Sequence, residues 1–244
     1  MNFMKLIGSL GAVMLLFALS VHAGDSKDTY SQSYVILIKG SPAGSETVTE
    51  SKSASGDLIS SSEHEIAVSD GLDTKRMTFT TKLVLSKSTG TPISYAYKYT
   101  TGGTGDFYDV AVKDSQIVRV LSKGGHTSES SLPLPPNMVL VDFNVYHQYD
   151  YLIRKYDAKK GGRQVFADYL PPIGNDLPIA VTYLGDVDIP TEKGPLPTKN
   201  FKVEIVGIMN NSLFVDKEGR LVRLLIPAQD LEVLRKDLIG PGKN

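Results

Sequence analysis

Apolar and β-branched residues in this chain occur in short runs, most of them about 6–12 residues long, that Gly, Pro, Asn and Asp divide. Tyr34–Lys39 is one such run, and apolar or aromatic side chains fall on alternate positions of Thr91–Thr101. Two further runs, Tyr108–Lys113 and Gln116–Ser122, flank a two-residue turn candidate. This pattern predicts an antiparallel meander of about ten or more strands.

The clearest hairpin pattern lies near the C-terminus. Ser212–Val215 and Arg220–Ile226 are apolar runs, and the residues between them read Asp-Lys-Glu-Gly. A four-residue loop with Gly at a position of positive φ fits this spacing. A calcium loop would need several oxygen ligands at alternating positions, and this segment offers only two carboxylates before the next strand. We therefore predict a turn here rather than a cation site.

One segment has helical periodicity. It follows a proline-rich break at 132–136, where both helix and central strand are disfavoured. Apolar residues then recur at spacings of three and four, which predicts an amphipathic helix over about 142–158 with Asp142 as its N-cap and Gly161-Gly162 as its stop. Leu231–Leu234 is ambiguous, and we favour a strand. The predicted fold is β-dominated: a bent antiparallel sheet or half-barrel, with one main helix covering its concave face.

The first 23 residues have the features of a secretory signal peptide. Lys5 precedes an apolar stretch without acidic residues, and Val21-His22-Ala23 fits the cleavage pattern. The alternative is an uncleaved anchor, although the stretch is short for a bilayer span. We expect cleavage near Ala23, a flexible lead-in over 24–33, a single domain over 34–238 and a tail over 239–244. The mature protein is then expected in the periplasm or outside the cell.

Composition excludes several classes of function. The chain has no cysteine, which excludes a lipid-modified N-terminus and disulfides, so the fold must depend on its apolar core. Loss of Lys5 with the leader leaves 25 basic and 27 acidic residues, a formal charge of −2 without a basic block. This near-neutral balance gives no indication of nucleic-acid binding.

Motifs for catalysis or metal binding are weak. His64, His126 and His147 show no recognisable metal-ligand spacing, and the chain contains no G-x-S-x-G motif. His147 and Asp150 are three residues apart on the predicted helix, which we interpret as a surface pair rather than a catalytic dyad. Carboxylates are numerous, but their sequence positions cannot show that two of them face each other. The sequence therefore predicts no catalytic residues, no metal and no cofactor.

Aromatic residues suggest a binding cavity instead. Tyrosine combines apolar area with a polar tip, which suits the wall of a partly hydrated cavity. Such side chains gather on one predicted strand face and on the predicted helix, while ordinary core packing is the alternative. The candidate ligand-binding residues are Tyr95, Tyr97, Phe143, Tyr146, Tyr149, Ile153 and Phe166.

Several segments in 136–226 carry a resemblance to a known family. These are Pro136–Asp142, the Tyr-rich segment that follows, Pro178–Gly185, Leu213–Asp216 and Gly219–Arg223. In this order they resemble a family of secreted bacterial proteins of unknown function, similar to the half-barrel periplasmic carriers of lipoproteins. The resemblance implies a strongly bent antiparallel sheet with helical elements on its concave face. It implies no catalytic residues.

Three functional hypotheses follow. The first is an envelope protein that binds a lipid, another amphipathic ligand or the lipidated end of a partner protein. The second is a structural or interaction protein of the envelope without a small-molecule ligand. The third, which the residues support least, is a hydrolase using His147 with Asp150 or a carboxylate pair. Peripheral membrane association and the oligomeric state stay open.

Overall fold

The alternating runs form strands throughout the part of the chain that the computed structural model describes, residues 29–69, 74–101 and 104–239. The predicted signal peptide and residues 240–244 of the predicted tail lie outside these ranges. The strands are β1 Tyr30–Ile38, β2 Ser41–Lys52, β3 Leu58–Ser69, β4 Thr74–Leu85, β5 Pro92–Thr101, β6 Thr104–Lys113, β7 Gln116–Lys123, β8 His126–Pro133, β9 Met138–Val139, β10 Arg163–Leu170, β11 Asn175–Thr191, β12 Gly194–Ile205, β13 Met209–Val215, β14 Leu221–Ile226 and β15 Leu231–Arg235.

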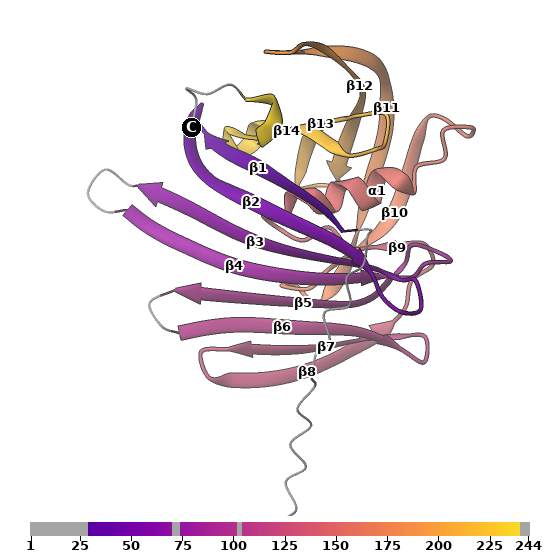
Figure 1. The fold of residues 1–244 in the computed structure, drawn as a ribbon. Helices are drawn as coiled ribbons and strands as arrows, with labels where there is room; N and C mark the ends of the chain where they lie inside the picture. The colour runs from indigo at the N-terminus through magenta and orange to yellow at the C-terminus, as the bar shows by residue number, and fades with distance from the viewer. Residues whose placement is uncertain (1–28, 70–73, 102–103, 240–244) are drawn as a thin grey trace, which may run out of the picture.

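All of these strands belong to one open, bent sheet (Figure 1). The described strands number 15, in the order β8-β7-β6-β5-β4-β3-β2-β1-β15-β14-β13-β12-β11-β10-β9. Neighbours are antiparallel except β9 and β10, which are parallel. The predicted β-dominated antiparallel fold is thus correct in outline. The proline-rich break at 132–136 covers the end of β8 and the link to β9. These two strands are the edges of the sheet, where prolines interrupt the fewest ladder hydrogen bonds.

The predicted hairpin and last strand are confirmed, and the start of the domain is corrected. β13 and β14 are antiparallel neighbours, and Gly219 has φ of 74° in the turn between them. The Oδ1 of Asp216 accepts hydrogen bonds from the backbone of Glu218 and Arg220, so this carboxylate closes the turn. β1 begins at Tyr30, so residues 30–33 belong to the sheet and not to a flexible lead-in.

The predicted helix over 142–158 is much shorter in the structure. A 3-10 turn, η1, covers Tyr146–Gln148, and α1 covers Tyr149–Arg154. Asp142 is not its N-cap, because Asn144 has a positive φ of 64° and breaks the helix before it can start. The other short helical turns are η2 (Pro227–Gln229) and η3 (Lys236–Leu238). No described helix is long and apolar enough to cross a membrane.

The short helix is a core element. Its residues from Tyr149 through Ile153 are all buried, although a surface helix would expose one face. Tyr149 accepts a hydrogen bond from Asn211 of β13, and Tyr151 donates one to Glu50 of β2. These contacts tie α1 to both halves of the sheet, whose strands curve around it in Figure 1.

Shortening Leu152 should therefore test how much the helix contributes to the core. Leu152 is 1% exposed and lies in the apolar cluster between α1 and the sheet. We expect Leu152→Ala to lower the free energy of unfolding by about 3 kcal/mol, from lost burial and the cavity left behind. Urea denaturation measures this loss in the free energy of unfolding. Leu184→Ala, at a position 56% exposed on β11, is the control and should cost less than about 0.5 kcal/mol. Equal losses in both variants would contradict a core role for α1.

Candidate functional site

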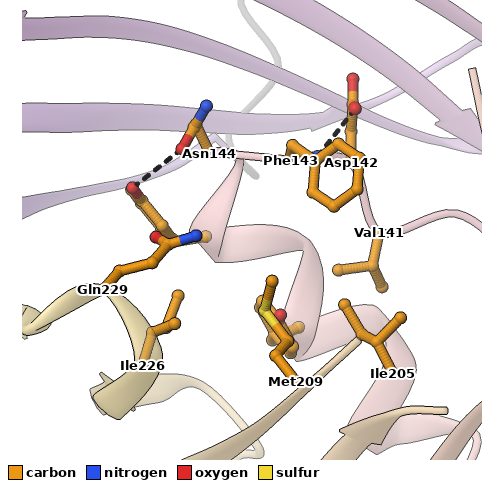
Figure 2. Close-up of a pocket in the computed structure, with 10 residues that line it drawn as sticks. Val141, Asp142, Phe143, Asn144, Ile205, Met209, Ile226 and Gln229 are labelled. Carbon is orange, nitrogen blue, oxygen red and sulfur yellow. Dashed lines mark hydrogen bonds between the residues drawn. The ribbon is translucent and has the colours of Figure 1, made fainter. Parts of the chain in front are cut away.

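A cavity of about 280 Å³ lies between the segment 141–149 and the ends of strands from the C-terminal half of the sheet (Figure 2). We call it the 141–149 pocket. The lining residues are Val141, Asp142, Phe143, Asn144, Tyr146, Tyr149, Ile205, Met209, Ile226 and Gln229. They come from one irregular segment with η1 and α1, and from β12, β13, β14 and η2.

Hydrogen bonds from the sheet hold the irregular segment in place. The buried carboxylate of Asp142 accepts from the hydroxyl of Tyr95 at 2.7 Å and from that of Tyr108. The backbone N–H of Asp142 donates to the side chain of Gln148 at 2.7 Å. These bonds satisfy the polar groups of a buried non-helical stretch, and so allow it to form one wall of the pocket.

A second carboxylate anchors the N-terminal end of this wall. Asp168 of β10 accepts a hydrogen bond from the backbone of Val141 at 2.8 Å. Burial raises the pKa of Asp168 well above its usual range, and the bond from Val141 offsets only part of this shift. Burial likewise raises the pKa of Asp142 to about 6, against the hydrogen bonds from Tyr108, Tyr95 and Phe143. Both carboxylates are therefore structural anchors, because each accepts hydrogen bonds that hold the segment 141–149 in place.

The pocket has an apolar floor and a polar rim. Val141, Tyr149 and Ile205 are buried, and they form its inner surface with Ile226. Asn144 and Gln229 are exposed at the opening, where their amides remain accessible. The Asn144 side chain accepts a hydrogen bond from the Tyr146 hydroxyl at 3.5 Å. The arrangement suits a ligand with one apolar end and one polar end.

Three of the seven residues predicted to bind a ligand line this pocket: Phe143, Tyr146 and Tyr149. Tyr95 does not, because its ring packs in a separate core cluster under β4–β7 and only its hydroxyl reaches Asp142. Tyr97 is half-buried and stacks on Tyr108 at 4.5 Å, next to a shallow hollow on the other part of the sheet. Ile153 and Phe166 are buried in the main core.

Sequence reasoning missed the other half of the pocket. Ile205, Met209, Ile226 and Gln229 lie at strand ends and in η2, far from the tyrosine-rich segment in sequence. No local pattern in the sequence indicated which strand ends the segment 141–149 faces. That juxtaposition depends on the long-range pairing of the sheet.

The expected surface pair of His147 and Asp150 is wrong. Both residues are buried, at 1% and 2% exposure. His147 bonds to Glu46 through Nδ1 and lies 3.0 Å from the Ser60 hydroxyl through Nε2. Asp150 instead accepts from the backbone N–H of Leu221 at 2.7 Å. The error arose because periodicity predicted a helix with a solvent face, whereas every residue of α1 except Arg154 is buried.

Ser60, His147 and Glu46 have the connectivity of a serine–histidine–carboxylate triad. The nucleophile of such a triad must reach a substrate. Ser60 is 0% exposed, and its partners are buried as well. In this conformation no substrate could contact the hydroxyl, so the geometry gives no support to a hydrolase at this position.

The fold has a counterpart among solved structures. A β-barrel-like protein of the domain of unknown function DUF1849 from Brucella abortus superposes with a TM-score of 0.59, at 11% identity, over 84% of this chain and 93% of that one. At this identity the similarity concerns the fold alone. It supports a β-barrel-like architecture shared with a protein of unknown function.

A second structure, a DUF1089 family protein from Pseudomonas aeruginosa, aligns over 91% of this chain and 98% of its own at 11% identity, with a TM-score of 0.38. This score is too low to carry a structural argument. No protein-family model matches the chain, and no curated protein matches it either.

Proposed function

We propose that the protein is a binding protein of the cell envelope, which holds a lipid or another amphipathic ligand in the 141–149 pocket. The observation that carries this proposal is the division of the pocket into an apolar floor and a polar rim. Burial of a hydrocarbon chain on Val141, Ile205 and Ile226 would remove apolar surface from water. The amides of Asn144 and Gln229 would then face a polar head group.

The size of the pocket favours a small ligand. Its volume of about 280 Å³ lies just below the range of roughly 300–1,000 Å³ typical of ligand pockets. One acyl chain is therefore a better match than a complete diacyl lipid. The same chemistry occurs in a free fatty acid and in the lipidated end of a partner protein.

The proposed location is the periplasm or the outside of the cell. Its support is the leader-like sequence of residues 1–23 and the resemblance of segments in 136–226 to secreted proteins and periplasmic lipoprotein carriers. An acyl chain in an aqueous compartment needs a carrier with an apolar site, which agrees with the shape of the pocket. The alternative is an envelope protein that acts through its surface without such a ligand.

Native mass spectrometry of the protein purified gently from its own cell envelope would test the proposal. We expect a discrete adduct that solvent extraction recovers as one lipid class. An adduct released only together with a protein chain would identify a lipidated partner as the source. A clean apo mass, combined with no capture of a fluorescent fatty acid, would overturn the proposal and favour the surface-acting alternative.

Filling the pocket should abolish capture. Met209 is half-buried and lines the cavity, so a tryptophan at this position would occupy the space of the ligand. We expect Met209→Trp to weaken binding of a dansyl-labelled fatty acid by at least about tenfold, the equivalent of 1.4 kcal/mol, in a fluorescence titration.

The neighbouring Ile208→Trp is a matched control, since Ile208 is 49% exposed and does not line the pocket. Its affinity should stay close to that of the unaltered protein. Circular dichroism would establish that both variants are folded. Unchanged capture by a folded Met209→Trp would show that the ligand, if one binds, does not occupy this pocket.

A further inference from the structure

Three side chains with metal-ligating chemistry meet inside the core, outside the lining of the 141–149 pocket. Glu46 of β2 and His64 of β3 are directly paired across the two strands, and His147 comes from η1. One ligand atom from each lies within 4.8 Å of the other two. Their exposed fractions are 0%, 3% and 1%, so this is an interior cluster and not a patch of surface charges.

The His64–Glu46 distance suits a small divalent cation, whereas the closer His147–Glu46 contact is a hydrogen bond that would open to admit one. Nε2 of His64 lies 3.4 Å from Oε1 of Glu46, and Nδ1 of His147 contacts the same oxygen. Zinc bonds of about 2.0–2.1 Å in a tetrahedral arrangement place neighbouring donor atoms roughly 3.3 Å apart. A cation between the three groups would replace the proton that Glu46 and His147 share.

Two buried atoms of the cluster have unused hydrogen-bonding capacity. Oε2 of Glu46 and Nδ1 of His64 find no hydrogen-bond partner among the described residues. A buried carboxylate with an unpaired oxygen is costly in free energy, and such groups usually pair or coordinate metals. Oε2 of Glu46 is thus a buried carboxylate oxygen that could accept a further partner.

Neighbouring hydroxyls fix the orientation of both imidazoles. The Ser60 hydroxyl lies 3.0 Å from Nε2 of His147, on the side of the ring away from Glu46. The Ser62 hydroxyl lies 2.6 Å from the Thr81 hydroxyl and 2.7 Å from Nε2 of His64, the nitrogen that faces Glu46, so a cation on this nitrogen would displace the Ser62 bond. The His64 ring also stacks on Phe79, with centroids 4.1 Å apart. Support of this kind around the ligands is typical of protein metal sites.

We propose that Glu46, His64 and His147 form an interior site for a first-row divalent cation, with Zn²⁺ as the best match. Two imidazoles and one carboxylate are ligands that Zn²⁺ accepts readily. The cation would join the β2–β3 hairpin to η1 and so fix the segment that leads into α1. Because the site is enclosed, the ion would enter during folding and act as a structural element. The proposal does not depend on the ligand of the 141–149 pocket.

Refolding of the full mature chain with and without metal would test the site. We expect elemental analysis to find close to one Zn²⁺ per chain after refolding with Zn²⁺ and desalting. At a hundredfold excess of Zn²⁺ over its Kd, the melting temperature should exceed that in EDTA by roughly 5–10 °C. Refolding with Co²⁺ should give the visible absorption of a tetrahedral ion with nitrogen and oxygen ligands.

Ligand variants separate this site from adventitious binding. Glu46→Gln and His147→Gln keep size and hydrogen bonding but should lose at least about a hundredfold in Zn²⁺ affinity, more than partners outside the coordination sphere usually contribute. His126→Gln, at an exposed histidine of β8, should bind as the unaltered chain does.

A variant that fails to refold does not remove the test, because the spectrum and stoichiometry of the unaltered chain decide it. The proposal is overturned if that chain retains no Zn²⁺ or Co²⁺ and melts at the same temperature in Zn²⁺ and in EDTA. Equal loss of metal in His126→Gln would also overturn it, since binding would then be unspecific. Fatty-acid capture measured on the same samples reports on the pocket separately.

Discussion

Replacing Arg220 with methionine is expected to lower the free energy of unfolding by about 4 kcal/mol, within the range for breaking a buried ion pair. Arg220 donates to the carboxylate of Glu50 at 2.7 Å, and Glu50 is 5% exposed. Arg154 lies farther away, at 3.8 Å, and the Tyr151 hydroxyl donates one hydrogen bond at 2.8 Å. Without Arg220, the buried charge of Glu50 would keep only these weaker partners.

Methionine is the appropriate replacement because the guanidinium of Arg220 also lies over the ring of Tyr30, at 3.6 Å. An unbranched apolar side chain keeps part of that packing, so the loss reports mainly on the charge. Arg163→Met is the control: its partner Glu204 lies at 3.1 Å, but both side chains are partly exposed, and the cost should be below about 1 kcal/mol. Urea denaturation of both variants compares the pairs. Similar losses would show that burial of Glu50 does not control the effect.

The contribution of Asp150 to the stability of the protein should fall as the pH rises from about 4 to about 7, because this carboxyl group is buried. Burial raises the pKa of Asp150 to about 7, although Arg154, His147, Arg220 and the Leu221 N–H favour its ionised form. In the unfolded chain the same carboxyl ionises near pH 4. Between these values the folded state binds the extra proton, so the contribution present at low pH is lost as the pH passes the folded pKa.

The size of this effect follows from the shift of roughly three pKa units, which corresponds to at most about 4 kcal/mol. Asp150→Asn cannot ionise and can still accept the hydrogen bond from Leu221. We expect the variant to gain stability relative to the unaltered chain as the pH is raised from 4 to 8, measured by denaturant titration at each pH. Asp188→Asn, at an exposed position of β11, should show no such trend. Parallel profiles for the unaltered chain and Asp150→Asn would refute the assignment.

Local chemistry explains which parts of the fold were predictable. Alternation and turn residues depend on neighbours in the sequence, so the meander, the β13–β14 hairpin and the strand at Leu231–Arg235 were predicted correctly. The helix was predicted too long because apolar residues recur at helical spacing from Val145 to Tyr156 and Asp142 has the chemistry of an N-cap. In the structure the Asp142 carboxylate instead accepts hydrogen bonds from the hydroxyls of Tyr95 and Tyr108. These residues lie on two strands that only tertiary folding brings near Asp142.

The interior polar cluster could not be predicted for the same reason. Glu46 and His64 are neighbours only in the register of β2 and β3, and His147 is joined to Glu46 across about 100 residues of chain. Metal motifs are recognised from sequence when the ligands share one helix or loop. Ligands on separate elements leave no such spacing, and His147 was therefore interpreted as a surface residue.

The pairing of β1 with β15 places the first and last described strands side by side within the sheet. If the chain is traced as a closed ring, every strand from β9 through β15 and on from β1 through β8 lies next to its successor. The break in that ring is the proline-rich link between β8 and β9, and not the pair of chain termini. Tyr34 and Arg235 are about 200 residues apart in the chain. Formation of the β1–β15 ladder therefore has the highest entropic cost of loop closure in the sheet. A chain synthesised from its N-terminus therefore cannot complete its core until β15 has emerged.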